Sequence, residues 1–190
     1  MNILDSRTKP FPYFLADHCL ADNVQQATLD WFEGGAPWKL ASTDFYEQYE
    51  FSLLDAEHPE SVAHLVSRAG LDTMREVVES TLNCSLTERI ELVAHKLVTG
   101  QRIGIHNDFL VGQETHRLTI QLNRGLTDDD GGFFMLFDSF DATDVHRVTR
   151  PLSNSGIGFE IGPSSHHAVS RVHGGSRYTL VYSFHAQSRS

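Results

Sequence analysis

The spacing of apolar residues changes along the chain, from a helical period in the first half to a period of two in the second. Over residues 20–31, apolar side chains recur every three or four positions, at Leu20, Val24, Ala27 and Trp31. This spacing puts them on one face of an amphipathic helix. Asp22 is a residue type that caps helix starts, and Gly34-Gly35 is typical of a helix end. We therefore predict a helix between these points.

A second helical pattern covers residues 62–82. Its apolar positions keep helical spacing on both sides of Gly70, where we expect the helix to break or kink because glycine weakens a helix interior. The segment between the two patterns includes 42–51, STDFYEQYEF, which is aromatic and acidic. We expect a loop there. We expect its aromatic residues either to form a lid over a substrate site or to pack against a sheet. These residues are Phe45, Tyr46, Tyr49 and Phe51.

From about residue 89, apolar and polar residues alternate, as in strands whose successive side chains face opposite sides of a sheet. Turn-rich segments such as GLTDDDGG and SNSG separate the alternating runs. The pattern predicts eight strands, at 90–98, 102–109, 116–123, 132–138, 144–149, 156–161, 166–172 and 177–184. Eight short strands after two or three helices predict an α+β protein, in which a jelly-roll-like sandwich is buttressed on one sheet by the N-terminal helices.

Length and charge narrow the possible functions. The 190 residues fit a single domain, with a helical part over about 1–88 and a jelly-roll core over about 89–185. The formal net charge of −10 disfavours nucleic acids and anionic membranes as partners, and no apolar run is long enough to span a bilayer. Two cysteines and an N-terminus without signal-peptide character favour a cytoplasmic location.

One pair of residues has the spacing of metal ligands. In GQRIGIHNDF, His106 and Asp108 are two positions apart, so both side chains point to the same face if the segment is a strand. An imidazole and a carboxylate on one face can share a metal ion. The alternative is an ordinary hydrogen bond between a histidine and a carboxylate.

Residues downstream make this pair more specific. The segment HHAVSRVHGGSRYTLVYSF contains the pattern H-x-V-x-x-V-x-x-G-x-R, formed by His167, Val169, Val172, Gly175 and Arg177. Together with Gly100, six residues before His106, and with Arg117-Leu118-Thr119, it makes residues 90–184 resemble the 2-oxoglutarate/Fe(II)-dependent oxygenases, particularly the prolyl-4-hydroxylase-like branch. The leader FPYFLADHCLADN is similar to that family's opening strand and helix.

The resemblance implies a double-stranded β-helix and a site for ferrous iron. Two histidines and one carboxylate on one face of an octahedral ion leave three positions open, which is the ligand set of non-haem Fe(II) oxygenases. His106, Asp108 and His167 are the expected ligands and catalytic residues. The resemblance also implies that 2-oxoglutarate takes two of the open positions and O2 the third. We expect hydroxylation of an amino-acid-like or peptidyl small substrate, because halogenating members replace the carboxylate ligand.

The far carboxylate of 2-oxoglutarate requires a cation. Arg177 offers a planar, bidentate guanidinium, and Thr179 lies on the same strand face and can add a hydroxyl. The alternative for Arg177 is a salt bridge in the core. In one respect the sequence departs from the family, since relatives often have a cosubstrate-binding tyrosine nine residues before the first histidine, where this chain has Leu97.

Other interpretations remain open at this stage. His166 competes with His167 as the second histidine ligand, and Arg117 either contacts substrate or extends along the sheet. We interpret the remaining histidines as surface or hydrogen-bonded residues, among them His95, His116, His146, His173 and His185. Two other functions compete with a hydroxylase: a metal-holding jelly-roll sensor without turnover, and a cupin-like metalloenzyme that does not use 2-oxoglutarate.

Overall fold

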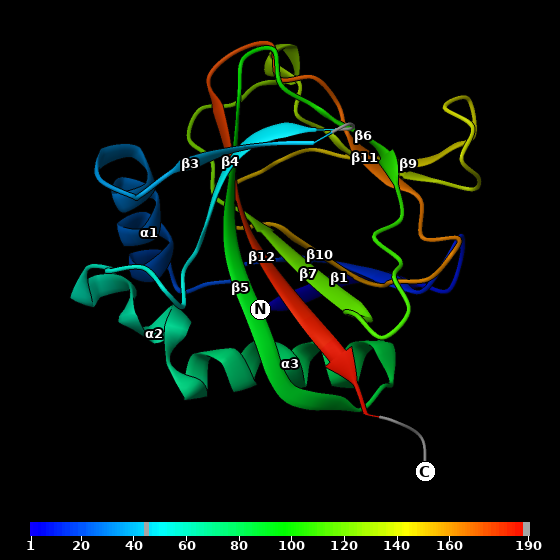
Figure 1. Ribbon diagram of the computed structural model, residues 1–190, viewed down its shortest axis with the longest axis horizontal. Coiled ribbons are helices and arrows are strands. Elements are labelled where there is room, and N and C mark those ends of the chain that lie inside the picture. Colours follow the sequence, from blue (N-terminus) through cyan, green and yellow to red (C-terminus); the bar gives the residue numbers. More distant parts are fainter. Residues whose placement is uncertain (44–45, 188–190) are drawn as a thin grey trace.

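Two antiparallel sheets face each other in this computed structural model, which describes residues 1–43 and 46–187, and helices cover the outer face of the larger sheet (Figure 1). In sheet order, the large sheet contains β1 (Asn2–Arg7), β2 (Tyr13–Asp17), β10 (Gly156–Glu160), β7 (His116–Gln121), β12 (Ser176–Ala186), β5 (Leu86–Val98), β4 (Glu47–Ser52) and β3 (Lys39–Ser42). The small sheet contains β6 (Ile103–His106), β11 (His167–Val169), β8 (Phe134–Phe137) and β9 (Val145–Thr149). The expected α+β class and double-stranded β-helix core are confirmed, with all eight predicted strands present.

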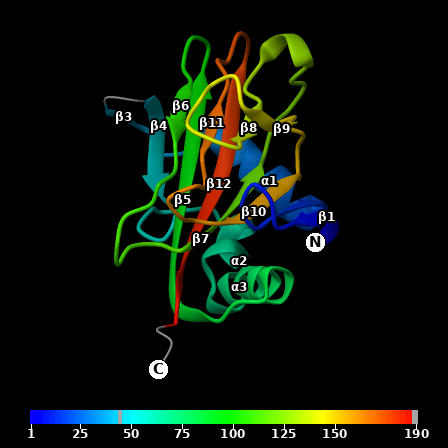
Figure 2. The ribbon, with the colours of Figure 1, turned by 90° about the vertical axis from the view of Figure 1, so that its right-hand side faces the viewer.

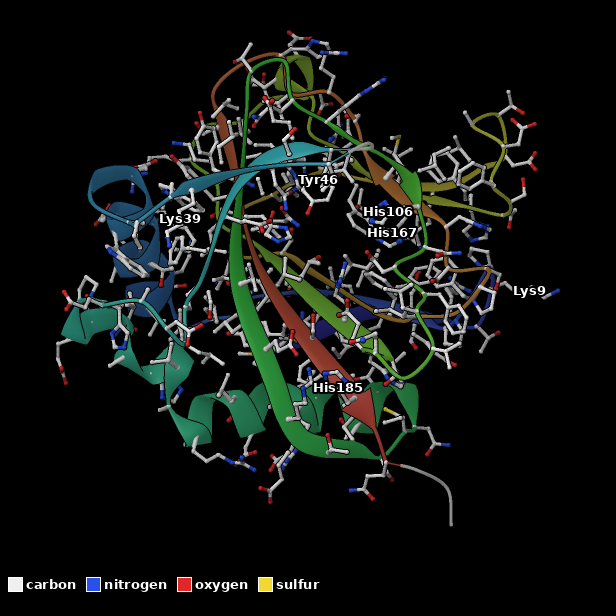
Figure 3. The ribbon with its side chains drawn as sticks, in the orientation of Figure 1. Lys9, Lys39, Tyr46, His106, His167 and His185 are labelled. Atoms are coloured by element: carbon white, nitrogen blue, oxygen red, sulfur yellow. The ribbon has the colours of Figure 1, made fainter. Side chains whose placement is uncertain are left out.

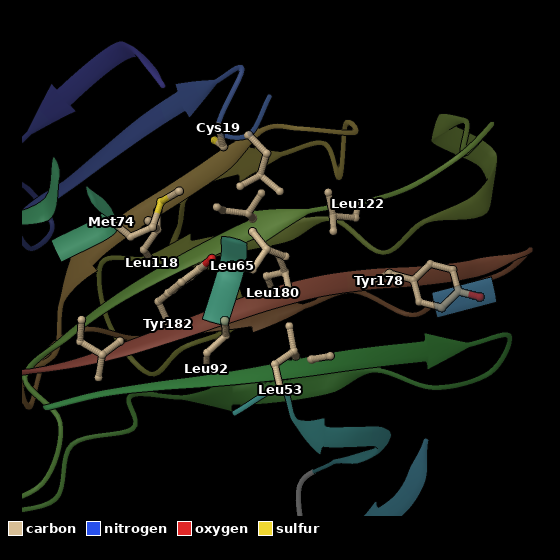
Figure 4. Close-up of a cluster of buried hydrophobic side chains, with 14 of the residues drawn as sticks. Cys19, Leu53, Leu65, Met74, Leu92, Leu118, Leu122, Tyr178, Leu180 and Tyr182 are labelled. Carbon is tan, nitrogen blue, oxygen red and sulfur yellow. The ribbon is translucent and has the colours of Figure 1, made fainter. Parts of the chain in front are cut away.

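The alternation of residues along the large sheet separates two environments. On β12, the even-numbered residues Tyr178, Leu180 and Tyr182 belong to the hydrophobic cluster under the helices. Figure 4 shows these side chains with Leu92 of β5 and Leu118 of β7. The odd-numbered residues of β12 point the other way, toward the small sheet. A second cluster of apolar residues, including Phe134, Ile157 and Phe159, fills part of the space between the sheets.

The helices lie where the pattern predicts them, with two differences in detail. They are α1 (Asp22–Gly34), α2 (Ala63–Val66) and α3 (Arg68–Leu82), and they lie against the outer face of the large sheet, with α2 and α3 toward one end (Figure 2). Ala21, rather than Asp22, is the N-cap of α1, so Asp22 lies in its first turn. Within the described residues, no helix is both long and apolar enough to span a membrane.

The break in the second helical pattern falls at Ser67, not at Gly70. Ser67 has extended backbone angles, and its side chain accepts a hydrogen bond from the Gly70 amide at 3.1 Å, which caps α3. Gly70 is needed for a different reason. A Cβ at this position would lie 2.0 Å from the carbonyl oxygen of His64, so glycine allows α2 and α3 to meet closely.

The prediction of a loop over 42–51 is wrong for most of that segment. Instead, β3 and β4 form a hairpin that pairs with β5 and extends the large sheet. The N-terminal part is therefore not purely helical. The alternation in β4 is hidden in the sequence because its inward-facing residues, Gln48 and Glu50, are polar. Phe51 is buried in the cluster under the helices, and Tyr49 packs beside Lys96. Phe45 lies outside the described residues.

Candidate metal centre

Backbone pairing brings His106 and His167 together. The two residues are direct partners in the antiparallel pairing of β6 with β11, which joins segments 61 positions apart in the chain. Figure 3 shows both imidazoles side by side between the two sheets. Asp108 completes the group: one ligating atom from each of the three residues lies within 4.8 Å of the others. The structure thus brings together all three predicted ligands.

Asp108 reaches this position differently from what the spacing predicts. The strand ends at His106, so the expected strand over 102–109 is shorter, and Asp108 adopts a left-handed backbone conformation with φ of 56°. Aspartate tolerates this region better than most residues. The turn is held by Asn107, whose side chain accepts from the Phe109 amide and donates to the Pro163 carbonyl. A tight turn, and not strand alternation, therefore directs the carboxylate toward the histidines.

The hydrogen bonds of the histidines determine which nitrogen faces the centre. Nδ1 of His106 lies 2.9 Å from the Gly104 carbonyl, and Nδ1 of His167 lies 2.8 Å from the Ser165 carbonyl. A carbonyl only accepts, so each Nδ1 carries the proton and each Nε2 presents a lone pair. These Nε2 atoms lie 3.3 and 3.0 Å from the Asp108 carboxylate oxygens. Acceptors this close repel one another unless a cation lies between them, and this arrangement fits a bound metal ion.

The surroundings favour the metal-binding protonation states of Asp108 and His167. Burial raises the pKa of Asp108, but its close neighbours, among them the Arg117 guanidinium, outweigh burial and leave that pKa below its usual value. Burial also lowers the pKa of His167, whose ring packs between Phe134 and Phe159. A carboxylate and neutral imidazoles are the forms that bind divalent metals.

Arg117 lies beside the trio and is paired twice. Its guanidinium donates to Asp108 Oδ2 at 2.5 Å and also to the Glu114 carboxylate. The contact with Asp108, which neither interpretation of Arg117 included, places this arginine beside the trio, and Arg117 also lines the adjoining cavity. Its positive charge therefore has carboxylate partners within the protein.

A cavity of about 210 Å³ adjoins the trio and extends between the two sheets. Arg177 and Thr179 of β12 line it from the large sheet, as expected from their shared face. The apolar part of its wall includes Ile103, Phe134 and Val181. A ligand in this cavity would lie against the trio and Arg177 together.

Arg177 is 3% exposed and holds its guanidinium in the cavity by two hydrogen bonds. Nε donates to the Gly132 carbonyl at 2.8 Å, and one terminal nitrogen donates to Thr179 Oγ1 at 2.7 Å. Among residues 1–43 and 46–187, no carboxylate lies within 4.0 Å of it, so the alternative of a core salt bridge is not found. Burial lowers the pKa of Arg177 to about 10. A buried guanidinium without a carboxylate partner is costly, so the site fits an anion.

Thr179 accepts from Arg177 and donates its own proton to Gln121 Oε1 at 3.1 Å. The hydroxyl proton is therefore used within the protein. Thr179 orients Arg177 rather than pointing its proton into the cavity.

Two residues that the sequence analysis considered for the site, His166 and Leu97, do not belong to the trio. His166 is not in the trio, and its ring contacts Phe140 instead. Leu97, at the position of the family tyrosine, is 1% exposed and packs in the apolar cluster between the sheets. Of the aromatic residues proposed as a lid, Tyr46 lines the cavity, near His106 in Figure 3.

Three further polar residues line the cavity and were not predicted from the sequence: Gln48 and Glu50 of β4 and His95 of β5. The two strands are paired, with Glu50 directly opposite His95, and the next partner in register is Thr179 of β12. His95 was expected at the surface or in a hydrogen bond. The sequence does contain one indication that His95 lines the cavity, because His95 lies two residues before Leu97 and so shares its strand face. This indication is informative only once the β4–β5 pairing is known.

Comparison with known proteins gives the fold a context. No protein-family model matches the chain, and no curated protein matches it significantly. Among solved structures, a Pseudomonas putida prolyl-4-hydroxylase is 19% identical and superposes with a TM-score of 0.74, over 93% of this chain and 93% of that one. A viral collagen prolyl hydroxylase from Paramecium bursaria Chlorella virus-1, solved with 2OG, is 16% identical, with a TM-score of 0.67 over 92% and 96%.

A prolyl hydroxylase from Trichoplax adhaerens, in complex with a hypoxia inducible factor peptide fragment, is 13% identical. Its TM-score is 0.73, over 92% of this chain and 83% of that one. At these identities the similarity establishes a shared fold. The resemblance inferred from the motifs is thus confirmed at the level of the fold, over more than nine-tenths of the chain.

Proposed function

We propose that this protein is a non-haem Fe(II) oxygenase that uses 2-oxoglutarate and O2 to hydroxylate an aliphatic carbon of an amino-acid-like or peptidyl substrate. One observation carries the proposal: His106, Asp108 and His167 adjoin the same cavity as a buried arginine that has no carboxylate partner among the described residues. A metal-binding sensor needs the trio but not the arginine. A cupin-like enzyme without a keto-acid cosubstrate would not provide the carboxylate that Arg177 is placed to bind.

The residues of this chain have separate tasks in the proposed reaction. His106, Asp108 and His167 would hold the ferrous ion, which, with 2-oxoglutarate and O2 bound, supplies oxidative decarboxylation to succinate and CO2 together with oxidation of a C–H bond. The backbone carbonyls of Gly104 and Ser165 fix both imidazole tautomers. The ligand geometry is therefore preset by the backbone before iron binds.

Arg177 would bind the far carboxylate of 2-oxoglutarate. Its bonds to the Gly132 carbonyl and to Thr179 hold the guanidinium in one orientation, while its remaining N–H groups are available to the carboxylate. The aromatic rings of Phe134 and Phe159 shield His167 from water. This shielding strengthens the electrostatic interactions inside the cavity.

The test supplies the purified protein with Fe(II) and 2-oxoglutarate and measures succinate formation by mass spectrometry. We expect iron-dependent succinate formation that N-oxalylglycine inhibits. A melting-temperature increase with Mn(II) plus N-oxalylglycine, larger than with Mn(II) alone, should accompany it. Failure to bind either Mn(II) or N-oxalylglycine would contradict the proposal.

A further inference from the structure

Glu50 places a carboxylate in the cavity without a lysine or arginine partner among the described residues. It lies on β4 of the large sheet and lines the same cavity as His106 and His167 of the small sheet. Within the part of the chain that the structure describes, no lysine or arginine nitrogen lies within 4.0 Å of the Glu50 carboxylate. Its side chain is 33% exposed, so the carboxylate is partly shielded from solvent. A partly shielded carboxylate is stabilised by a positive charge, which a cationic ligand in the cavity would supply.

The two polar neighbours of Glu50 do not supply that charge. The Gln48 amide donates a hydrogen bond to Glu50 Oε2 at 2.8 Å, and it is neutral. His95 Nε2 lies 3.9 Å from the same oxygen. Burial, together with the positive charges of Arg117 and Arg177, lowers the pKa of His95 to about 3, so this imidazole is also neutral near pH 7.

The other charges around the cavity cancel when the proposed cosubstrates are bound. Arg117 is already paired with Glu114. The two positive charges of a ferrous ion and the one of Arg177 balance Asp108 and the two carboxylates of 2-oxoglutarate. Glu50 then leaves the loaded cavity with one excess negative charge. This step rests on the proposed function.

We propose that Glu50 binds a positively charged nitrogen group, an ammonium or a guanidinium, on the substrate that is hydroxylated. Facing sheets pack about 10 Å apart, so a basic side chain anchored on β4 spans the cavity toward the metal-binding wall. Ile103 and Val181 in the lining contact its aliphatic part. The net charge of −10 increases the encounter rate with a cation. The substrate class is thus a basic amino acid or a peptide with a basic side chain.

The experiment compares charged ligands with neutral isosteres. Calorimetric titrations of the protein loaded with Mn(II) and N-oxalylglycine would use arginine against citrulline and lysine against norleucine. The tripeptides Ala-Arg-Ala and Ala-citrulline-Ala distinguish a peptidyl from a free substrate. We expect the charged member of at least one pair to bind about tenfold more tightly or better. No measurable binding of any charged probe, or equal affinity within every pair, would overturn the inference.

Variants assign the preference to Glu50. Glu50→Gln keeps the size of the side chain and should remove the preference for the charged member, whereas Glu50→Asp keeps the charge and should retain part of it. Glu88→Gln is the matched control, because that glutamate is 83% exposed on β5 and contacts Arg68; it should bind as the wild type does. A charge preference that survives in Glu50→Gln would overturn the assignment.

The two proposals fail in different ways. The increase in melting temperature with Mn(II) and N-oxalylglycine should be the same in wild type and Glu50→Gln, which also shows that the variant is folded. If the wild type shows this increase but no charge preference, the inference is wrong and the oxygenase function stands. If the wild type does not bind N-oxalylglycine, the oxygenase function fails, and the inference that rests on it fails as well.

Discussion

His106 and His167 are direct partners in the β6–β11 pairing, and their ring centroids lie 4.2 Å apart. In each case Nδ1 bonds to the carbonyl oxygen of the residue two positions earlier. The relative position of the two Nε2 atoms is therefore fixed by strand register and two local hydrogen bonds, not by long flexible side chains. Pre-positioned ligands of this kind lower the entropy cost of binding a metal.

Removing one of these ligands should abolish metal binding and leave the fold intact. We expect His167→Ala to lose the increase in melting temperature with Mn(II) and to lose Fe(II)-dependent succinate formation. The reason is that two remaining ligands hold a divalent ion far more weakly than three. Thermal unfolding with and without Mn(II) checks this expectation.

The neighbouring histidine provides the control. His166 contacts Phe140 and is not one of the three clustered residues, so His166→Ala should keep the response to Mn(II). The assignment of His167 would be wrong if the two variants behaved in the opposite way.

Arg177→Met should separate cosubstrate binding from stability. The variant removes a buried guanidinium that has two hydrogen bonds and no carboxylate partner within the described residues. Replacing such a charge with an apolar side chain of similar size tends to be neutral or stabilising. We therefore expect the free energy of unfolding of the metal-free protein to be unchanged or increased, while the affinity for N-oxalylglycine falls about tenfold or more.

Binding of Mn(II) alone serves as the control for this variant, since the metal ligands are untouched. Calorimetry with Mn(II), followed by N-oxalylglycine, measures both steps on one sample. Unchanged affinity for N-oxalylglycine would contradict the role of Arg177.

The parts of the site that could be predicted depend on local patterns. The alternation of apolar residues predicted all eight strands of the core. His106 was indicated by its spacing from Asp108, whereas His167 and Arg177 were indicated by the motif that resembles the 2-oxoglutarate/Fe(II)-dependent oxygenases. Asp108 was predicted as a ligand, but its left-handed backbone was not, because spacing of two is also compatible with a strand.

The polar wall of the cavity could not be predicted, because it arises from long-range pairing. Glu50 and His95 are 45 positions apart and become neighbours only when β4 joins the edge of β5. Strands that line a polar cavity also lose the apolar alternation by which strands are recognised. The residues that distinguish this site therefore lie where the apolar alternation predicts strands least well.

Gly158→Ala should destabilise the contact between β10 and β2. Gly158 lies opposite Phe14 in the strand register, and a Cβ at this position would come within 2.2 Å of the Phe14 ring. Phe14 is fully buried, so the ring has little room to move away. We expect the free energy of unfolding to fall by about 1–3 kcal/mol, measured by urea denaturation.

Gly162→Ala is the matched control, because a Cβ there meets nothing within 4 Å. Its free energy of unfolding should change by no more than about 0.5 kcal/mol. Equal effects of the two substitutions would show that the Phe14 contact is not the cause.

The stability of the metal-free protein should fall as the pH is lowered from 6.5 toward 4. Burial lowers the pKa of His116 to about 4, while an unfolded histidine titrates near 6.5. Between these values the unfolded chain binds a proton that the folded protein does not, so the free energy of unfolding rises with pH. His95, with its pKa lowered to about 3, adds to the same slope.

His116→Gln should flatten this slope. Loss of one titrating imidazole lowers it by up to about 1.4 kcal/mol per pH unit around pH 5, because the difference in bound protons falls by nearly one. The hydrogen bond between His116 and Thr115 is lost or altered as well, which lowers the whole curve but does not change its slope. Urea denaturation at several pH values between 4.5 and 7 measures the slope directly. An unchanged slope in the variant would mean that His116 is protonated in the folded protein, in contradiction to its buried, neutral state.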